Sequence, residues 1–143
     1  MKKIATIILN RNLPGPTDML VEHLKRFDGD TTDVFVVEAG SDKDKVSRYC
    51  TWYADWPAAM EYGLRYSRGM NYGLSRLREE GKFDRYDAFF LLTNDTEIPE
   101  TVTIASLLEI MEKHNRVGIL SPCSKRWGER FLFNRQSTKY FWF

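Results

Sequence analysis

With 143 residues, the chain fits one domain that is large enough to bury a core of its own. Its 21 basic and 20 acidic residues almost cancel, which argues against a nucleic-acid-binding protein, because such a protein needs surplus cations to displace counterions from phosphates. The charge balance does not exclude binding of a small anionic ligand, since such a ligand needs only one or two local cations. No apolar run approaches the roughly 18 residues of a membrane-spanning helix.

The first half of the sequence predicts a strand–helix–strand unit. The apolar run 4–9 is typical of a strand buried on both faces, and residues 33–38 repeat that pattern. Between the two strands, Thr17 is predicted to cap a helix that Gly29 ends, with an apolar face made of Met19, Leu20, Leu24 and Phe27. Two strands joined in this way are expected to be parallel. The stretch 44–58 gives a weaker pattern, and its aromatic residues fit a half-buried helix.

The second half continues the alternation of helices and strands. We expect a helix over 70–80 that Gly81 ends, a buried strand over 87–92, a helix that Pro99 opens and that runs to about 114, and a short strand over 117–120. This order predicts an α/β fold, a three-layer α/β/α sandwich around a mainly parallel, Rossmann-like sheet.

One domain over residues 1–143 is the expected organisation, with 123–143 as an unassigned tail. The tail ends on the aromatic residues Phe141, Trp142 and Phe143, so we expect either a truncated chain or a contact between copies in a homo-oligomer. Cys50 and Cys123 are expected to be free buried thiols, because they lie far apart and do not form a CxxC pair. The residues predict a cytoplasmic domain, with peripheral attachment to the inner face of a membrane as the alternative.

Polar residues follow three of the predicted strands, in the segments 10–12, 38–42 and 94–97. Ligands of open parallel sheets bind beyond the carboxyl ends of the strands, so three such segments on one edge predict a ligand site. Each segment taken alone also fits an ordinary turn. Asp95 and Glu97 are spaced to share one hard cation, Mg²⁺ or Mn²⁺, and the alternative is that Asn94 or Asp95 only caps the turn before the next helix.

In their order and spacing these segments resemble the N-terminal half of family 2 glycosyltransferases, which have the GT-A fold. Residues 7–12 resemble the first strand with its terminal asparagine, 36–42 resemble the family segment VVDNGSxD, 61–73 resemble NxGfarGxNxG, and 91–97 resemble LLNNDTE, the family's variant of the DxD motif. The resemblance covers residues 4–122.

The resemblance implies a site for a nucleoside-diphosphate sugar and a divalent metal, Mn²⁺ or Mg²⁺. It implies that Asn10 and Asn12 lie near the base and that Glu38 contacts the base or the ribose. Arg68, Asn71 and Asn94 would line the nucleotide and diphosphate pocket, while Asp95 would bind the metal with Glu97 as a second ligand. Glu38 and Ala39 stand where the family has Asp and Asn, which leaves the choice of base open.

The function expected from the resemblance is inverting glycosyl transfer, with a saccharide or a lipid-linked saccharide as the acceptor. No catalytic base is assigned, because residues 121–143 do not match the acceptor-binding segment of the family. The alternative is an inactive fragment or a non-catalytic GT-A-like module that binds a nucleotide or a partner protein. A nucleotidyltransferase is a third reading, but residues 10–15 lack the glycine-rich, cationic loop that it needs after the first strand.

Overall fold

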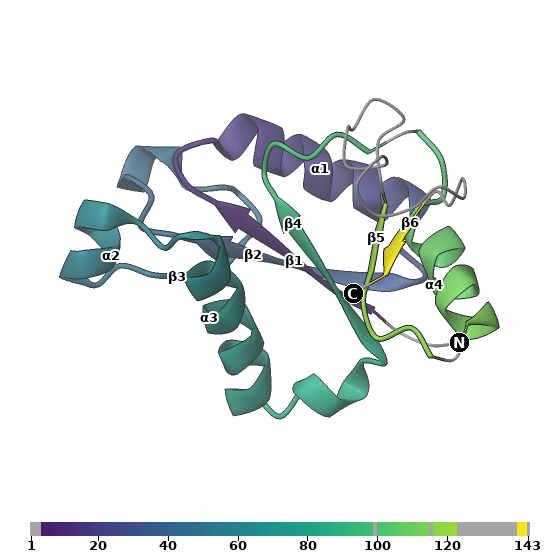
Figure 1. Ribbon diagram of the computed structural model, residues 1–143. Coiled ribbons are helices and arrows are strands. Elements are labelled where there is room, and N and C mark those ends of the chain that lie inside the picture. Colours follow the sequence, from purple (N-terminus) through teal and green to yellow (C-terminus); the bar gives the residue numbers. More distant parts are fainter. Residues whose placement is uncertain (1–3, 99, 115, 123–139, 143) are drawn as a thin grey trace. The chain divides into compact units, whose positions relative to one another are not determined.

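The computed structural model describes residues 4–98, 100–114, 116–122 and 140–142. The chain divides into two compact units, Met1–Ile104 and Ala105–Phe143. A parallel sheet of four strands in the order β3-β2-β1-β4 forms the first unit together with its helices, so the fold belongs to the α/β class (Figure 1). Among the described residues no helix is both long and apolar enough to cross a bilayer.

The elements of the first unit follow one another as strand and helix. They are β1 (Ile4–Asn10), α1 (Pro14–Phe27), β2 (Thr32–Glu38), the 3₁₀ turn η1 (Lys43–Lys45), β3 (Cys50–Tyr53), α2 (Pro57–Tyr62), α3 (Tyr66–Glu79), the 3₁₀ turn η2 (Phe83–Arg85) and β4 (Ala88–Thr93). Helix α4 (Ile104–Lys113) begins at the last residue of this unit. The predicted strands therefore match β1, β2 and β4 to within one residue at each end.

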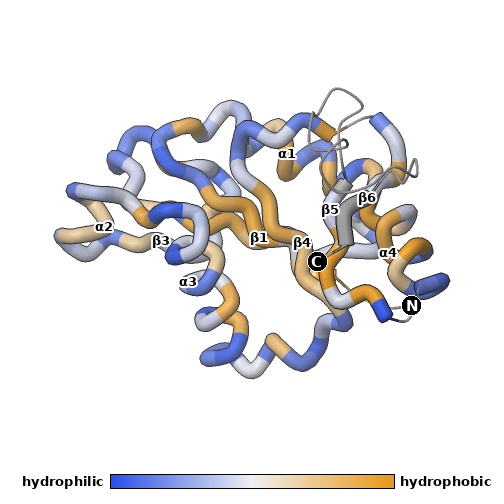
Figure 2. Tube along the Cα trace, in the orientation of Figure 1, coloured by the Kyte–Doolittle hydropathy of each residue, from blue (hydrophilic) through white to orange (hydrophobic). Residues whose placement is uncertain are grey.

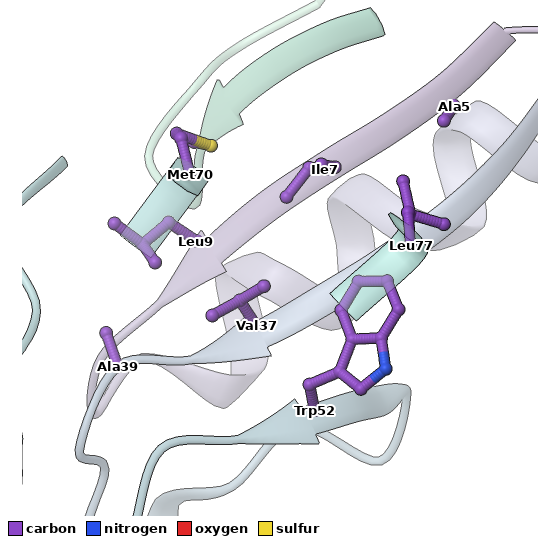
Figure 3. Packing of buried hydrophobic residues seen from close by; sticks show 8 residues of the cluster. All are labelled: Ala5, Ile7, Leu9, Val37, Ala39, Trp52, Met70 and Leu77. Carbon is purple, nitrogen blue, oxygen red and sulfur yellow. The ribbon is translucent and has the colours of Figure 1, made fainter. Parts of the chain in front are cut away.

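Strand β1 is the centre of the core, and all seven of its residues are buried. Figure 2 shows it as a hydrophobic strand that leads into hydrophilic connections. Helix α3 runs antiparallel along β1, because an added Cβ at Gly69 would meet Leu9 and one at Gly73 would meet Ile7. Figure 3 shows the resulting cluster, in which Met70 of α3 lies beside Leu9 of β1 and Leu77 of α3 lies beside the ring of Trp52.

The half-buried helix expected around Trp52 is wrong, because residues 50–53 form the edge strand β3. The Trp52 ring stacks on Phe35 of β2 with ring centroids 5.2 Å apart, and its Nε1 donates to Glu80 at the end of α3 over 2.7 Å. Contacts with residues distant in the sequence thus decide the conformation of this segment.

Helix α1 begins three residues before its predicted cap. Pro14 occupies the first turn, where the missing N–H of proline is harmless, and Thr17 lies inside the helix with its hydroxyl donating to the carbonyl of Leu13 over 2.8 Å. Leu20 and Leu24 are buried as expected, but Met19 is 72% exposed, so its assignment to the apolar face is wrong.

Helices α3 and α4 also begin elsewhere than predicted. Helix α3 starts at Tyr66 instead of residue 70. Pro99 lies outside the described residues, and α4 starts at Ile104, where the backbone N–H groups of Thr103 and Ile104 donate to the buried carboxylate of Asp28 over 3.3 and 2.9 Å. A carboxylate 76 positions away in sequence therefore caps this helix.

The second unit contains a sheet of two antiparallel strands, β5 (Leu120–Pro122) and β6 (Tyr140–Trp142). The strand β5 therefore begins at Leu120, which is the last residue of the short strand predicted over 117–120. It pairs with β6 in the aromatic tail instead of with the parallel sheet. Phe143 lies outside the described residues.

Candidate functional site

The order of the strands places a switch point between β1 and β4. From β1 the chain proceeds to β2 and β3 on one side, and it then crosses back to β4 on the other side of β1. Ligands of open parallel sheets usually bind beyond the carboxyl ends of the strands at such a switch point. Asn10 ends β1 and Asn94 follows β4 at this point.

The carboxylate of Glu38, at the end of β2, is completely buried and receives four hydrogen bonds. Asn10 Nδ2 donates to Oε1 over 3.0 Å and to Oε2 over 2.9 Å. The Ser41 hydroxyl donates to Oε2 over 2.5 Å, and the backbone N–H of Ser47 donates to Oε1 over 2.8 Å. Hydrogen bonds of this kind offset the cost of removing a carboxylate from water.

Asn10 carries this arrangement across the sheet. Its side chain is completely buried, and its Oδ1 accepts from the backbone N–H of Leu13 over 3.2 Å and from Asn94 Nδ2 over 2.9 Å. Side chains from the ends of β2, β1 and β4 are thus joined in one row. We call Glu38, Asn10 and Asn94 the carboxamide relay.

Asn12 connects the loops that follow β1 and β2. It has a φ of 59°, in the left-handed region that asparagine tolerates better than most residues. Its Oδ1 accepts from the backbone N–H of Asp42 over 2.7 Å, and its own N–H donates to the Ser41 hydroxyl over 3.1 Å. Asp42 in turn accepts from Lys45 over 2.8 Å, and this hydrogen bond lowers the pKa of the Asp42 carboxyl.

Helix α3 brings its first turn to the same edge of the sheet. The Tyr66 hydroxyl donates to the carbonyl of Leu91 in β4 over 3.5 Å, and Gly69 lies against Leu9 near the end of β1. Arg65 precedes the helix, and no side chain of the described residues caps the first N–H groups of α3. Arg68 and Asn71 are exposed on the first two turns.

The Arg11 side chain is committed to a neighbouring helix. It donates from Nη1 to the carbonyl of Tyr62 over 2.9 Å and from Nη2 to that of Glu61 over 3.4 Å, at the end of α2. An added Cβ on Gly63, whose φ is 69°, would come within 2.2 Å of that guanidinium group. A side chain at position 63 would therefore displace Arg11 from the end of α2.

Asp95 and Glu97 lie in the turn after β4, and both are exposed. The turn is closed by the Thr96 N–H donating to the carbonyl of Thr93 over 3.2 Å. Neither carboxylate is engaged by a hydrogen bond or an ion pair with another described residue. Two free carboxylates suit Mg²⁺ or Mn²⁺, which keeps several waters and takes oxygen ligands from phosphates. Among the described residues no group of three or more His, Cys, Asp or Glu side chains gathers as a fuller metal site.

The structure thus brings three of the predicted site residues into direct contact, namely Glu38, Asn10 and Asn94. Asn12 lies in the adjacent loop. The remaining four lie exposed on α3 or after β4, and in the described part of the chain none of them forms a hydrogen bond with this row: Arg68, Asn71, Asp95 and Glu97. Sequence reasoning missed the contributions of Ser41 and Ser47 to Glu38. Ser41 lies within the segment 38–42 and was open to discovery there, whereas the sequence around Ser47 carries no such signal.

Comparison of the chain with protein-family models, with curated proteins and with solved structures gave no match.

Proposed function

We propose that this chain binds a nucleoside-diphosphate sugar together with Mn²⁺ or Mg²⁺, as the donor-binding half of a GT-A-type glycosyltransferase of family 2. The observation that carries the proposal is the hydrogen bond of 2.9 Å from Asn94 to Asn10. It fixes the residue next to Asp95 at the switch point of a parallel sheet, where ligands of such sheets bind. The segment 94–97, which carries the proposed metal ligands Asp95 and Glu97, therefore follows a strand end that suits a ligand.

The proposed fold is the three-layer sandwich of that family. Side chains alternate along a strand, so Ala5, Ile7 and Leu9 of β1 share the face that α3 covers. Asn10 and its even-numbered neighbours point to the other face. Helix α1 contacts both β1 and β2, and we propose that it covers this second face.

The diphosphate is proposed to lie between the first turn of α3 and the turn after β4. Uncapped N–H groups at a helix start attract anions, and the exposed Arg68 adds a charge that pairs with phosphate oxygens. Asn71, one turn further along α3, is proposed to line the same pocket. Asp95 and Glu97 would hold the metal, which neutralises the charge that develops on the departing diphosphate. No residue is proposed as the base that activates an acceptor.

Calorimetry with UDP-, GDP- and dTDP-sugars, each with and without Mn²⁺, tests the proposal. We expect one of them to bind more tightly when Mn²⁺ is present, and absence of binding by all three with metal would refute it. Binding without hydrolysis or transfer of the donor would favour the non-catalytic module instead.

The variant Asp95→Ala tests the metal role. We expect it to reduce the Mn²⁺-dependent part of the nucleotide affinity on the order of tenfold, as loss of support at metal sites generally does. Asp30→Ala is the matched control, since Asp30 is an exposed carboxylate before β2 at the opposite edge of the sheet. Equal affinities for Asp95→Ala and Asp30→Ala would remove the metal role from Asp95.

A further inference from the structure

We propose that Glu38 is a positioning residue that does not touch the nucleotide and that acts through Asn10 and Asn94 on the segment carrying Asp95. This inference rests on the proposed function, and it departs from the base or ribose contact that the family resemblance implies for Glu38. Three features of the structure support the inference. The oxygens of the Glu38 carboxylate are all occupied by hydrogen bonds, the hydrogen bonds of the carboxamide relay run in one direction, and the relay ends next to Asp95.

The Glu38 carboxylate has no oxygen left for a ligand. Each oxygen accepts two hydrogen bonds, and the side chain has no exposed surface. A ribose hydroxyl that bonded to it would have to displace Asn10, Ser41 or Ser47. Two more hydrogen bonds hold the loop that contains Ser41. The backbone N–H of Asn12 donates to the Ser41 hydroxyl, and the Tyr53 hydroxyl donates to the Ser41 carbonyl. Ligand access to Glu38 would therefore break several buried bonds at once.

The charge of Glu38 sets the orientation of the relay. A carboxylate only accepts hydrogen bonds, whereas a carboxamide has one donor end and one acceptor end. Glu38 therefore turns the Nδ2 of Asn10 towards itself and the Oδ1 of Asn10 towards Leu13 and Asn94. Asn94 then has to present its own Nδ2 to Asn10. One buried charge thus fixes two amide groups in a row.

The relay ends beside the exposed carboxylates. Asn94 directly precedes Asp95, and the turn that follows is closed only within itself by Thr93 and Thr96 among the described residues. The Asn94 side chain therefore ties this turn to β1. Because a metal carboxylate has to be held in place to be effective, loss of the tie is expected to weaken metal-assisted binding more than metal-free binding.

The variant Glu38→Gln tests the inference with little change in shape. A glutamine cannot accept from Asn10, Ser41 and Ser47 together, and if Asn10 turned round to accept from it, Asn10 Nδ2 would face the donors of Leu13 and Asn94. Combining Glu38→Gln with Asn10→Asp reverses that one donor and acceptor. The aspartate then accepts from the glutamine with one oxygen and from Leu13 and Asn94 with the other, so the tie is restored at unchanged net charge.

Thr6→Val is the matched control. Thr6 is completely buried four residues earlier on β1, on the same face as Asn10, and its hydroxyl lies 2.7 Å from that of Thr32. This variant removes a buried hydrogen bond from the same strand without touching the relay. Stability of all variants is measured by denaturant unfolding, and affinities are compared at full folding.

Two measurements decide the outcome. We expect Glu38→Gln to reduce the Mn²⁺-dependent gain in nucleotide affinity on the order of tenfold, to leave the metal-free affinity within about twofold, and to regain the loss with Asn10→Asp. We also expect the NMR signals of the Asn94 side-chain amide, recorded without ligand, to lose the pattern of a hydrogen-bonded amide in Glu38→Gln, to regain it in the double variant, where the acceptor is a carboxylate, and to stay unchanged in Thr6→Val.

Equal losses with and without metal that Asn10→Asp does not restore would show that Glu38 contacts the nucleotide, which overturns the inference. An unchanged metal-dependent gain with an unchanged Asn94 amide would show that Glu38 only stabilises the fold, which also overturns it. If the native chain binds no nucleotide, the proposed function fails. The ligand-free Asn94 amide signals then still decide whether the relay exists.

Discussion

Gly40 lies between Glu38 and Ser41, and its replacement by alanine is expected to destabilise the protein by about 2–4 kcal/mol. Its φ is 80°, and an alanine in the left-handed region costs about 1–2 kcal/mol. The added Cβ would also lie 1.8 Å from the Ala59 carbonyl oxygen and 3.1 Å from Met60 N. These are backbone atoms of α2 that no rotamer change can move. Overpacking of this kind costs about 1–3 kcal/mol more. Reduced freedom of the unfolded chain returns roughly 0.4–1 kcal/mol.

Gly81→Ala isolates the contribution of the close approach. Gly81 also has a positive φ, 64°, but an added Cβ there would have no heavy atom within 4 Å. This control is expected to lose only about 1 kcal/mol, because it carries the conformational cost alone. The free energies of unfolding follow from guanidinium titrations monitored by tryptophan fluorescence, provided that the m-values agree. Equal destabilisation of Gly40→Ala and Gly81→Ala would show that the loop after β2 does not depend on its contact with α2.

Two further predictions concern the edge strand β3. Trp52→Phe retains the ring beside Phe35 but removes the 2.7 Å hydrogen bond to Glu80, so a loss of about 1–2 kcal/mol in the free energy of unfolding is expected, and an unchanged value would contradict a role for that bond. Burial, with a smaller effect of the Glu38 charge, raises the pKa of the Cys50 thiol from 9.0 to about 11. Alkylation of Cys50 at pH 8, followed by peptide mass spectrometry, should therefore proceed much more slowly in the folded than in the unfolded chain. The raised pKa also means that this thiol contributes stability that is fully present below about pH 9 and is lost as the pH rises through 11, which unfolding titrations across that range would detect.

Three of the strands were predictable because their apolar residues leave a direct mark on the sequence. Strands β1, β2 and β4 carry apolar runs of the kind that is typical of buried parallel strands, although in β4 only Leu92 is buried and the other residues are half-buried. Strand β3 has only four residues at the edge of the sheet, and its pairing with β2 includes a register shift. Its aromatic residues fit a helix equally well, and the pairing with β2 together with the contacts of Trp52 with Phe35 and Glu80 favours the strand.

Helix starts were less predictable because their caps come from unexpected places. Helix α1 uses prolines in its first turn, ahead of Thr17, the residue that was predicted to cap it. Helix α4 is capped by Asp28, which lies 76 positions away and gives no local signal. Boundaries of this kind depend on the tertiary structure, so the periodicity of apolar residues located α1, α3 and α4 but not their first residues, and it did not locate α2.

For the candidate site, the sequence predicted that Asn10, Glu38 and Asn94 gather, but it predicted the same of residues that stay apart, and it did not predict how the three are used. The order of the strands was enough to bring Asn10, Glu38 and Asn94 to one edge. The oxygens of the Glu38 carboxylate are fully occupied only with the help of the backbone N–H of Ser47. Ser47 lies nine positions away at the end of an irregular loop, where no periodic sequence pattern exists. Whether a carboxylate is free for a ligand is thus a property of loop geometry that the motif alone does not contain.

The most direct test of the account is calorimetric titration of the chain with UDP-, GDP- and dTDP-sugars in the presence and absence of Mn²⁺. We predict that at least one donor binds, that Mn²⁺ tightens the binding, and that Asp95→Ala removes most of this gain while Asp30→Ala retains it. If none of the three donors binds with Mn²⁺ present, the assignment of a nucleotide-sugar site to this edge of the sheet is contradicted.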